Sequence, residues 1–175
     1  AVFTVIDHTE LGASASSWDV TSIPSSYDHL LVKVSARSDS SGTYGGEVRV
    51  TFNGDTGTNY SGTLLWAYQS PPQSTRASGA AYMNYSYVSG ASQAANTFGS
   101  ATYWIPNYSN TANFKQMISK SAAEDASSTA LDWIVATEAG LWSSTAAVNQ
   151  ITLTAGAADN FVQYSTFTLY GVTGA

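Results

Sequence analysis

The chain has 175 residues, of which 43% are hydrophobic and 10% are charged, and it contains two His and no Cys. This length predicts one domain over residues 1–175, with enough apolar material for a core that needs neither disulfides nor a metal. The net charge of −6 without a basic cluster argues against nucleic acid as a partner, and the apolar runs are too short to span a membrane. Because His, Cys and charged residues are scarce, we expect a structural or binding role and no enzymatic activity.

Short runs of alternating apolar and polar residues follow one another along the chain, separated by clusters of Gly, Ser, Asn and Asp. The pattern predicts an all-β fold, an antiparallel two-sheet β-sandwich of jelly-roll or Greek-key type. Expected strands cover residues 3–8, 17–20, 30–36, 47–52, 64–68, 80–88, 98–105, 115–121, 131–137, 148–154 and 165–170. Leu30, Val32 and Val34 alternate with Lys33 and Ser35, which indicates one core face and one solvent face.

Two stretches between these runs have a different composition. Residues 69–79, with Pro71, Pro72 and Arg76, are predicted to be an exposed loop, the kind of segment that often carries recognition. Residues 122–130 are rich in Ser and Ala and could form either a short helical turn or a loop. No internal repeat or linker interrupts the chain.

Several stretches together resemble a known group of proteins. They are SIPSSY at 22–27 followed by HLLVKVSAR at 29–37, VTFNGDTGTNY at 50–60, ANTFGSA at 95–101, YWIPNY at 103–108, GLW at 140–142, and residues 161–172. Over nearly its whole length the sequence is similar to small β-sandwich proteins and C-terminal domains of tailed phages. The resemblance implies a virion structural protein, either a capsid decoration protein or part of a tail fibre. It also allows a trimer, and it implies no catalytic or binding residues.

The segment 53–59 has an architectural interpretation and a chemical one. Asn53 and Gly54 are suited to a turn with positive φ, Asp55 to Asn59 can satisfy loop backbone groups, and Tyr60 can cover the loop with its ring. Asn53, Asp55, Thr58 and Asn59 also offer oxygen atoms of the type that Ca²⁺ binds, although their spacing does not match an EF-hand. We favour the hydrogen-bonded turn and assign no metal or cofactor.

Catalytic candidates are few. His8 and His29 are the only imidazoles, and no nucleophile motif accompanies either of them. Glu124, Asp125 and Glu138 are expected to be solvated charges, and nothing selects a pair of carboxylates for glycoside hydrolysis. We therefore predict no catalytic residue.

Aromatic residues are the better candidates for function, because five Trp and eleven Tyr exceed what a core of this size needs. Core positions are expected for Trp18, Trp104 and Trp133. In the run 80–88, Met83, Tyr85 and Tyr87 should share one face, opposite Tyr82, Asn84 and Ser86. The residues predicted to contact an interface or a glycan are Trp66, Tyr68, Tyr85, Tyr87, Tyr108 and Trp142.

These observations and the resemblance favour a non-enzymatic protein of the virion surface, extracellular when mature. It would bind identical copies and capsid or tail proteins through strand edges and aromatic loops. Two alternatives remain open. One is a carbohydrate-binding or receptor-binding module that recognises host glycan with exposed aromatic rings, and the other is a self-assembling extracellular filament subunit.

Overall fold

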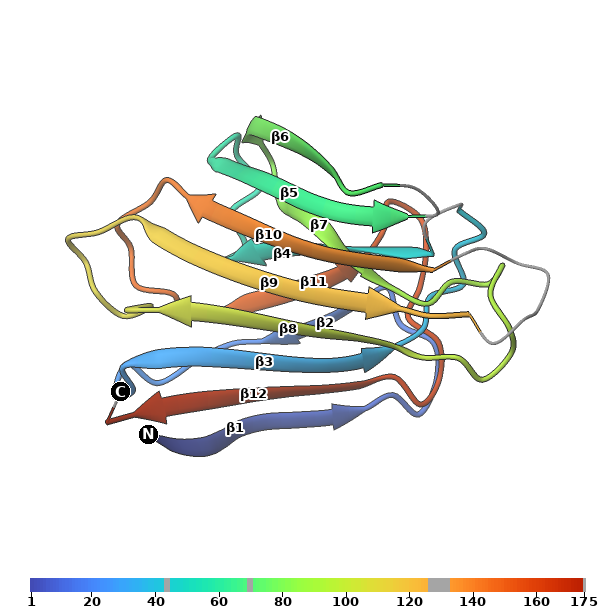
Figure 1. Cartoon of the computed structure of the whole chain (residues 1–175). Coiled ribbons are helices and arrows are strands. Elements are labelled where there is room, and N and C mark those ends of the chain that lie inside the picture. The colour runs from blue at the N-terminus through green and yellow to red at the C-terminus, as the bar shows by residue number, and fades with distance from the viewer. Residues whose placement is uncertain (43–44, 69–70, 126–132, 175) are drawn as a thin grey trace.

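The computed structural model describes residues 1–42, 45–68, 71–125 and 133–174, and within these ranges it contains two antiparallel sheets packed against each other (Figure 1). Across the larger sheet the strands are β1 (Val2–Glu10), β12 (Thr166–Thr173), β3 (His29–Ala36), β8 (Gly99–Pro106), β9 (Lys115–Ala123), β10 (Ile134–Trp142), β5 (Tyr60–Tyr68) and β6 (Gln73–Ala80). Across the smaller sheet they are β2 (Ser17–Val20), β11 (Ile151–Ala155), β4 (Gly46–Phe52) and β7 (Met83–Val88). The predicted all-β sandwich is confirmed.

Figure 1 shows the eight-stranded sheet with its strands side by side from β6 at the top to β1 at the bottom, and the four-stranded sheet behind it. The described ranges contain no helix, and therefore none long and apolar enough to cross a membrane. Of the run 122–130, Ala122 and Ala123 belong to β9, and residues 126–132 lie outside the described chain.

Alternation of side chains builds the core between the sheets. In β3 the residues Leu30, Val32 and Val34 point inward, and in β11 Ile151 and Leu153 do the same. Because successive residues of a strand face opposite sides, one face of each sheet is apolar and buried while the residues of the other face are exposed or half-buried. The alternation of apolar and polar residues that predicted these strands is therefore a consequence of the packing of the two sheets against each other.

Strand β6 corrects the prediction of a loop at 69–79. Residues 73–80 pair with β5 from Trp66↔Gln73 to Tyr60↔Ala80, at the edge of the larger sheet. Most of its side chains are exposed on both faces. An edge strand without a buried face needs no apolar alternation, so Gln-Ser-Thr-Arg-Ala-Ser-Gly-Ala had the composition of a loop.

The tryptophans divide between core and surface. Trp18 is buried, as predicted, and stacks on Phe167 with 5.4 Å between ring centroids. Trp104 was expected in the core, but it is half-buried on the outer side of β8, because its neighbours Tyr103 and Ile105 take the inward positions. Trp133 is also only half-buried, immediately before β10. Parity along the strand, rather than ring size, decides which aromatic enters the core.

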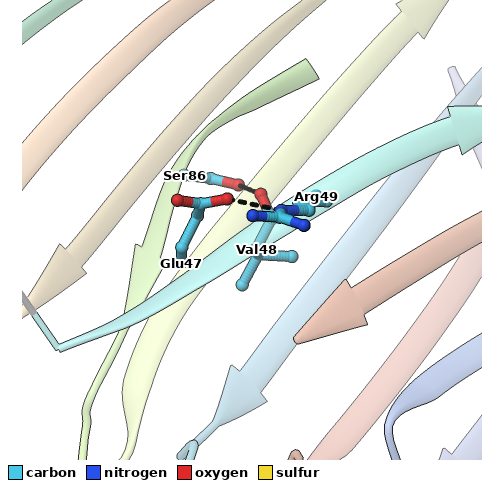
Figure 2. A network of polar contacts seen from close by, with 4 residues as sticks. All are labelled: Glu47, Val48, Arg49 and Ser86. Atoms are coloured by element: carbon cyan, nitrogen blue, oxygen red, sulfur yellow. Dashed lines mark hydrogen bonds and ion pairs between the residues drawn. The ribbon is translucent and has the colours of Figure 1, made fainter. Parts of the chain in front are cut away.

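A β-bulge overturns the predicted face assignment in β7. Val48 is opposite Ser86 and Val50 is opposite Met83, so β7 contains one residue more than β4 between these pairs. Both Met83 and Ser86 consequently point into the core. The Ser86 hydroxyl lies 2.8 Å from the Tyr103 hydroxyl and donates to the Val48 carbonyl at 3.3 Å, the latter contact being drawn in Figure 2.

Candidate functional site

The six aromatic residues predicted to contact a partner are distributed over several environments. Tyr108 is fully buried and Trp142 is 3% exposed, so both pack inside this chain. Trp66, Tyr68 and Tyr87 are half-buried. The side chain of Tyr85 lies outside the described part of the chain. The five described side chains therefore do not form one exposed surface.

Tyr108 acts as a structural clamp between two loops. Its hydroxyl donates to the Pro24 carbonyl and accepts from the Tyr27 backbone N–H at 3.4 Å. Burial raises the pKa of the Tyr108 hydroxyl, which favours the neutral form that donates to the Pro24 carbonyl. The stretches 22–27 and 103–108 are thus held side by side by the hydrogen bonds of the buried Tyr108 side chain.

The segment 53–59 forms the predicted hydrogen-bonded turn. Asn53 and Gly54 have φ angles of 54° and 65°, as expected for a turn that needs positive φ at both positions. Asp55 accepts from the Gly57 backbone N–H at 2.8 Å, from the Asn59 amide at 2.9 Å and from the Trp142 indole N–H at 2.6 Å. The Trp142 bond, followed by the Asn59 bond, lowers the pKa of the Asp55 carboxyl.

The hydroxyl of Tyr60 also stabilises this turn. Its hydroxyl accepts from the Phe52 backbone N–H at 3.0 Å and donates to the Asp55 carbonyl at 3.1 Å, and burial raises its pKa to about 12. Asn53 accepts from the backbone N–H groups of Asn149 and Gln150 at 2.8 and 3.1 Å. Of the oxygens that suggested a calcium site, those of the Asn53 and Asp55 side chains therefore accept hydrogen bonds that hold the turn together. Within the described ranges, no group of three or more His, Asp or Glu residues could hold a metal ion.

The two imidazoles are strand residues with local partners. His8 Nδ1 lies 2.8 Å from the Thr168 hydroxyl, and His29 Nδ1 accepts from the Asn107 backbone N–H at 3.1 Å. The His29 ring also lies 4.9 Å from the ring of Trp104. Both imidazole rings therefore contact residues of the larger sheet or of the turn beside it.

Glu138 corrects the expectation of a solvated charge. It is 1% exposed, because its position in β10 faces the core near Tyr103, whose pKa is raised mainly by burial. Glu124 is exposed, as expected, whereas Asp125 is half-buried and accepts from the Ala94 backbone N–H at 2.8 Å.

The outer face of the eight-stranded sheet carries two ordered rows of side chains. Register partners across six neighbouring strands place an apolar row of Val5, Tyr170, Leu31, Trp104, Ile118 and Ala139. Two residues farther along β12, β3, β8, β9 and β10, on the same face, a second set of register partners forms a basic row. Its members are His8, Thr168, Lys33, Thr102, Lys120 and Thr137. All twelve side chains are exposed or half-buried. Residues from widely separated parts of the sequence therefore form two continuous stripes.

A hollow of about 460 Å³ lies at the end of the basic row. Its wall includes Lys120, Thr102 and Thr137 from the row, together with Leu65 and Val135 from the neighbouring strands. Trp66, one of the aromatic candidates, also lines it. The hollow is thus mainly apolar with a cationic and hydroxyl-bearing side.

Half of the cationic side chains of the chain are engaged internally. Arg37 donates to the carbonyls of the loop at residues 93–97, and Lys115 is buried and donates to the carbonyls of Asn113 and Thr145. Arg49 pairs with Glu47 at 2.6 Å, as Figure 2 shows. These three cations stabilise loops and the smaller sheet.

The remaining cations, Lys33, Lys120 and Arg76, are exposed and all lie on the outer face of the larger sheet. Of the acidic residues in the strands described for this sheet, Glu10 alone faces outward, near one edge. A chain with a net charge of −6 thus presents one locally positive face.

The edges of the larger sheet are β1 and β6. The β1 edge is apolar at its beginning, where Val2, Phe3 and Val5 are 63%, 53% and 55% exposed. A bulge between Val5 and Asp7 interrupts the regular pairing of β1 with β12. The first half of β1 therefore combines an unpaired backbone edge with exposed apolar side chains.

Comparison of the chain with family models, with curated proteins and with solved structures gave no match.

Proposed function

We propose that the chain is a non-enzymatic structural protein of a phage virion surface, in a capsid-decoration or tail-fibre role. It acts by binding identical copies and neighbouring virion proteins. The resemblance of the sequence to phage β-sandwich proteins supports the virion location. The free edge of β1 supports the mode of action, and it is the observation on which the proposal rests.

An exposed strand edge with apolar side chains is a favourable place for another chain to add a strand. The backbone N–H and C=O groups of β1 that face away from β12 can pair with a partner strand. Burial of Val2, Phe3 and Val5 in the same contact would add about 25 cal/mol for each Å² of apolar surface removed from water. Because the bulge follows Val5, the joint would use the first half of β1.

Cryo-electron microscopy of the native particle tests this function, since it locates the chain and counts its copies. The proposal expects density for the chain arrayed over an icosahedral shell or along a tail fibre, with β1 against a neighbour. A particle without the chain overturns the proposal. A free helical polymer would also overturn it, in favour of an extracellular filament subunit.

A further inference from the structure

The geometry points to a second activity that does not rest on the proposed function: the outer face of the larger sheet binds a linear acidic polysaccharide that lies across the strands. The ligand would carry carboxylates that project to the same side at every second sugar. Its carboxylates would lie on the basic row and its sugar rings on the apolar row.

The basic row has a spacing that matches such a ligand. Basic side chains occupy every second strand, with His8 on β1, Lys33 on β3 and Lys120 on β9. Neighbouring strands are about 4.8 Å apart, so the backbone positions of Lys33 and Lys120 are about 10 Å apart across β8. One pyranose unit of an extended chain spans close to one interstrand spacing. Carboxylates on alternate sugars would therefore meet alternate strands.

Hydroxyl groups fill the positions between the basic side chains. Thr168, Thr102 and Thr137 occupy the strands that carry no basic residue in this row. Lys33 donates to the Thr102 hydroxyl at 3.2 Å, and the Thr137 hydroxyl donates to the Ser119 carbonyl at 2.8 Å. A threonine hydroxyl has one donor and two acceptor positions, so each retains capacity to bind a sugar hydroxyl.

The apolar row repeats with the same period. Tyr170 and Trp104 are half-buried and lie two strands apart on β12 and β8, on either side of Leu31. This row runs parallel to the basic row at a distance of about 7 Å, the rise of two residues along a strand. Aromatic rings pack well against the C–H face of a pyranose. Both rows therefore fit one extended ligand in one direction.

Charge complementarity selects an acidic ligand. Three exposed cations share this face, and Glu10 is the only outward carboxylate in the strands described for the sheet. From His8 to Thr137 the row crosses six strands and is about 24 Å long. It ends at the 460 Å³ hollow beside Lys120, which can take a terminal sugar.

Isothermal titration calorimetry with the purified chain tests this inference. The probe is a hyaluronan octasaccharide, in which alternate sugars carry a carboxylate, compared with the same octasaccharide after reduction of its carboxyl groups. We expect heat of binding with the acidic form and at least tenfold weaker binding with the reduced form. Affinity should increase with chain length up to about five sugars, one for each interstrand spacing of the row.

Variants place the ligand on the two rows. Lys33→Gln and Lys120→Gln should each weaken binding about threefold, and Trp104→Ala about fivefold. Arg49→Gln is the matched control, since it removes one charge from the smaller sheet and should leave the affinity unchanged. All three test residues have exposed or half-buried side chains, and thermal unfolding verifies that each variant is folded.

Three results would overturn the inference. The first is no heat with the acidic octasaccharide up to millimolar concentration, and the second is an equal loss in Arg49→Gln and Lys120→Gln. The third is equally tight binding of a polyglutamate peptide of the same charge, which would show that the face recognises an acidic protein surface. None of these results concerns the edge of β1, so the proposed function is tested independently of this inference.

Discussion

The turn at residues 53–59 and the outer face of the larger sheet both carry polar side chains, but these side chains are used differently. In the turn, the carboxylate of Asp55 and the amide of Asn53 are consumed by hydrogen bonds within the chain. On the outer face, Lys33 and Lys120 remain exposed and stand in register. A cluster that is dense in sequence can be entirely structural, whereas a binding surface can be assembled from residues that no local motif connects.

The largest expected effect contrasts two tryptophans, one under the turn and one on the outer face. Trp142 is 3% exposed, packs on Phe52 and Tyr60, and donates to Asp55. Trp142→Ala should lower the free energy of unfolding by about 3–5 kcal/mol, because it leaves a cavity. Trp104→Ala, on the half-buried outer face, should cost about 1 kcal/mol. Urea unfolding measures both, and equal losses would contradict the distinction.

The hydroxyl of Tyr60 gives the next largest effect. Tyr60→Phe leaves the buried Phe52 N–H without its acceptor and should cost about 1–3 kcal/mol at pH 7. The raised pKa of about 12 implies a stabilising contribution that is complete below about pH 10 and is lost as pH rises toward 12. Urea unfolding from pH 8 to 12 should show a steeper loss in the wild type than in Tyr60→Phe. Tyr164→Phe, at a 63% exposed position, is the control and should follow the wild type.

Asp55 provides a smaller, acid-dependent effect. Its lowered pKa means that its contribution is present above about pH 4 and is lost as pH falls through the folded-state value. Asp55→Asn should cost about 1 kcal/mol at pH 7 and should flatten the decline of stability below pH 4. Thermal unfolding from pH 2 to 7 measures this. Parallel curves for the variant and the wild type would show that the turn does not depend on the charge.

The smallest effect on folding, with the largest on assembly, is expected at the edge of β1. In a Phe3→Lys, Val5→Lys double variant the free energy of unfolding should change by at most about 0.5 kcal/mol per site, since both side chains are more than half exposed. If the first half of β1 joins copies, as proposed, the wild type self-associates in sedimentation velocity and the double variant does not, because lysines on an edge strand oppose strand addition. Wild-type association that persists in this variant would assign the contact to another surface.

Sequence reasoning predicted the strands whose faces differ in polarity, and it failed where that difference is absent or interrupted. The strand β3 was evident because Leu30, Val32 and Val34 alternate with exposed residues. The strand β6 was missed because its exposed side chains show no alternation. In β7 a single extra residue moved Ser86 to the core side, and no local signal in the sequence marks such a bulge.

The candidate surfaces were less predictable than the fold. The role of the turn at Asn53 and Gly54 followed from local conformational preference, and the structure confirms it. The basic and apolar rows could not be found in the same way, since Lys33, Thr102 and Lys120 become neighbours only through the strand order β3-β8-β9. Knowledge of the pairing order, rather than of any motif, was the missing information.

The pairing of Val2 with Thr173 has a kinetic consequence. In the sheet, β12 lies between β1 and β3, although both of these strands come much earlier in the sequence. During synthesis β1 and β3 emerge long before their shared neighbour, so this part of the sheet can close only after β12 has left the ribosome. Such non-local pairing slows folding to the range of milliseconds to seconds. A nascent chain would thus carry β1 without a backbone partner until translation has passed β12, a period in which a chaperone or a second nascent copy could reach that strand.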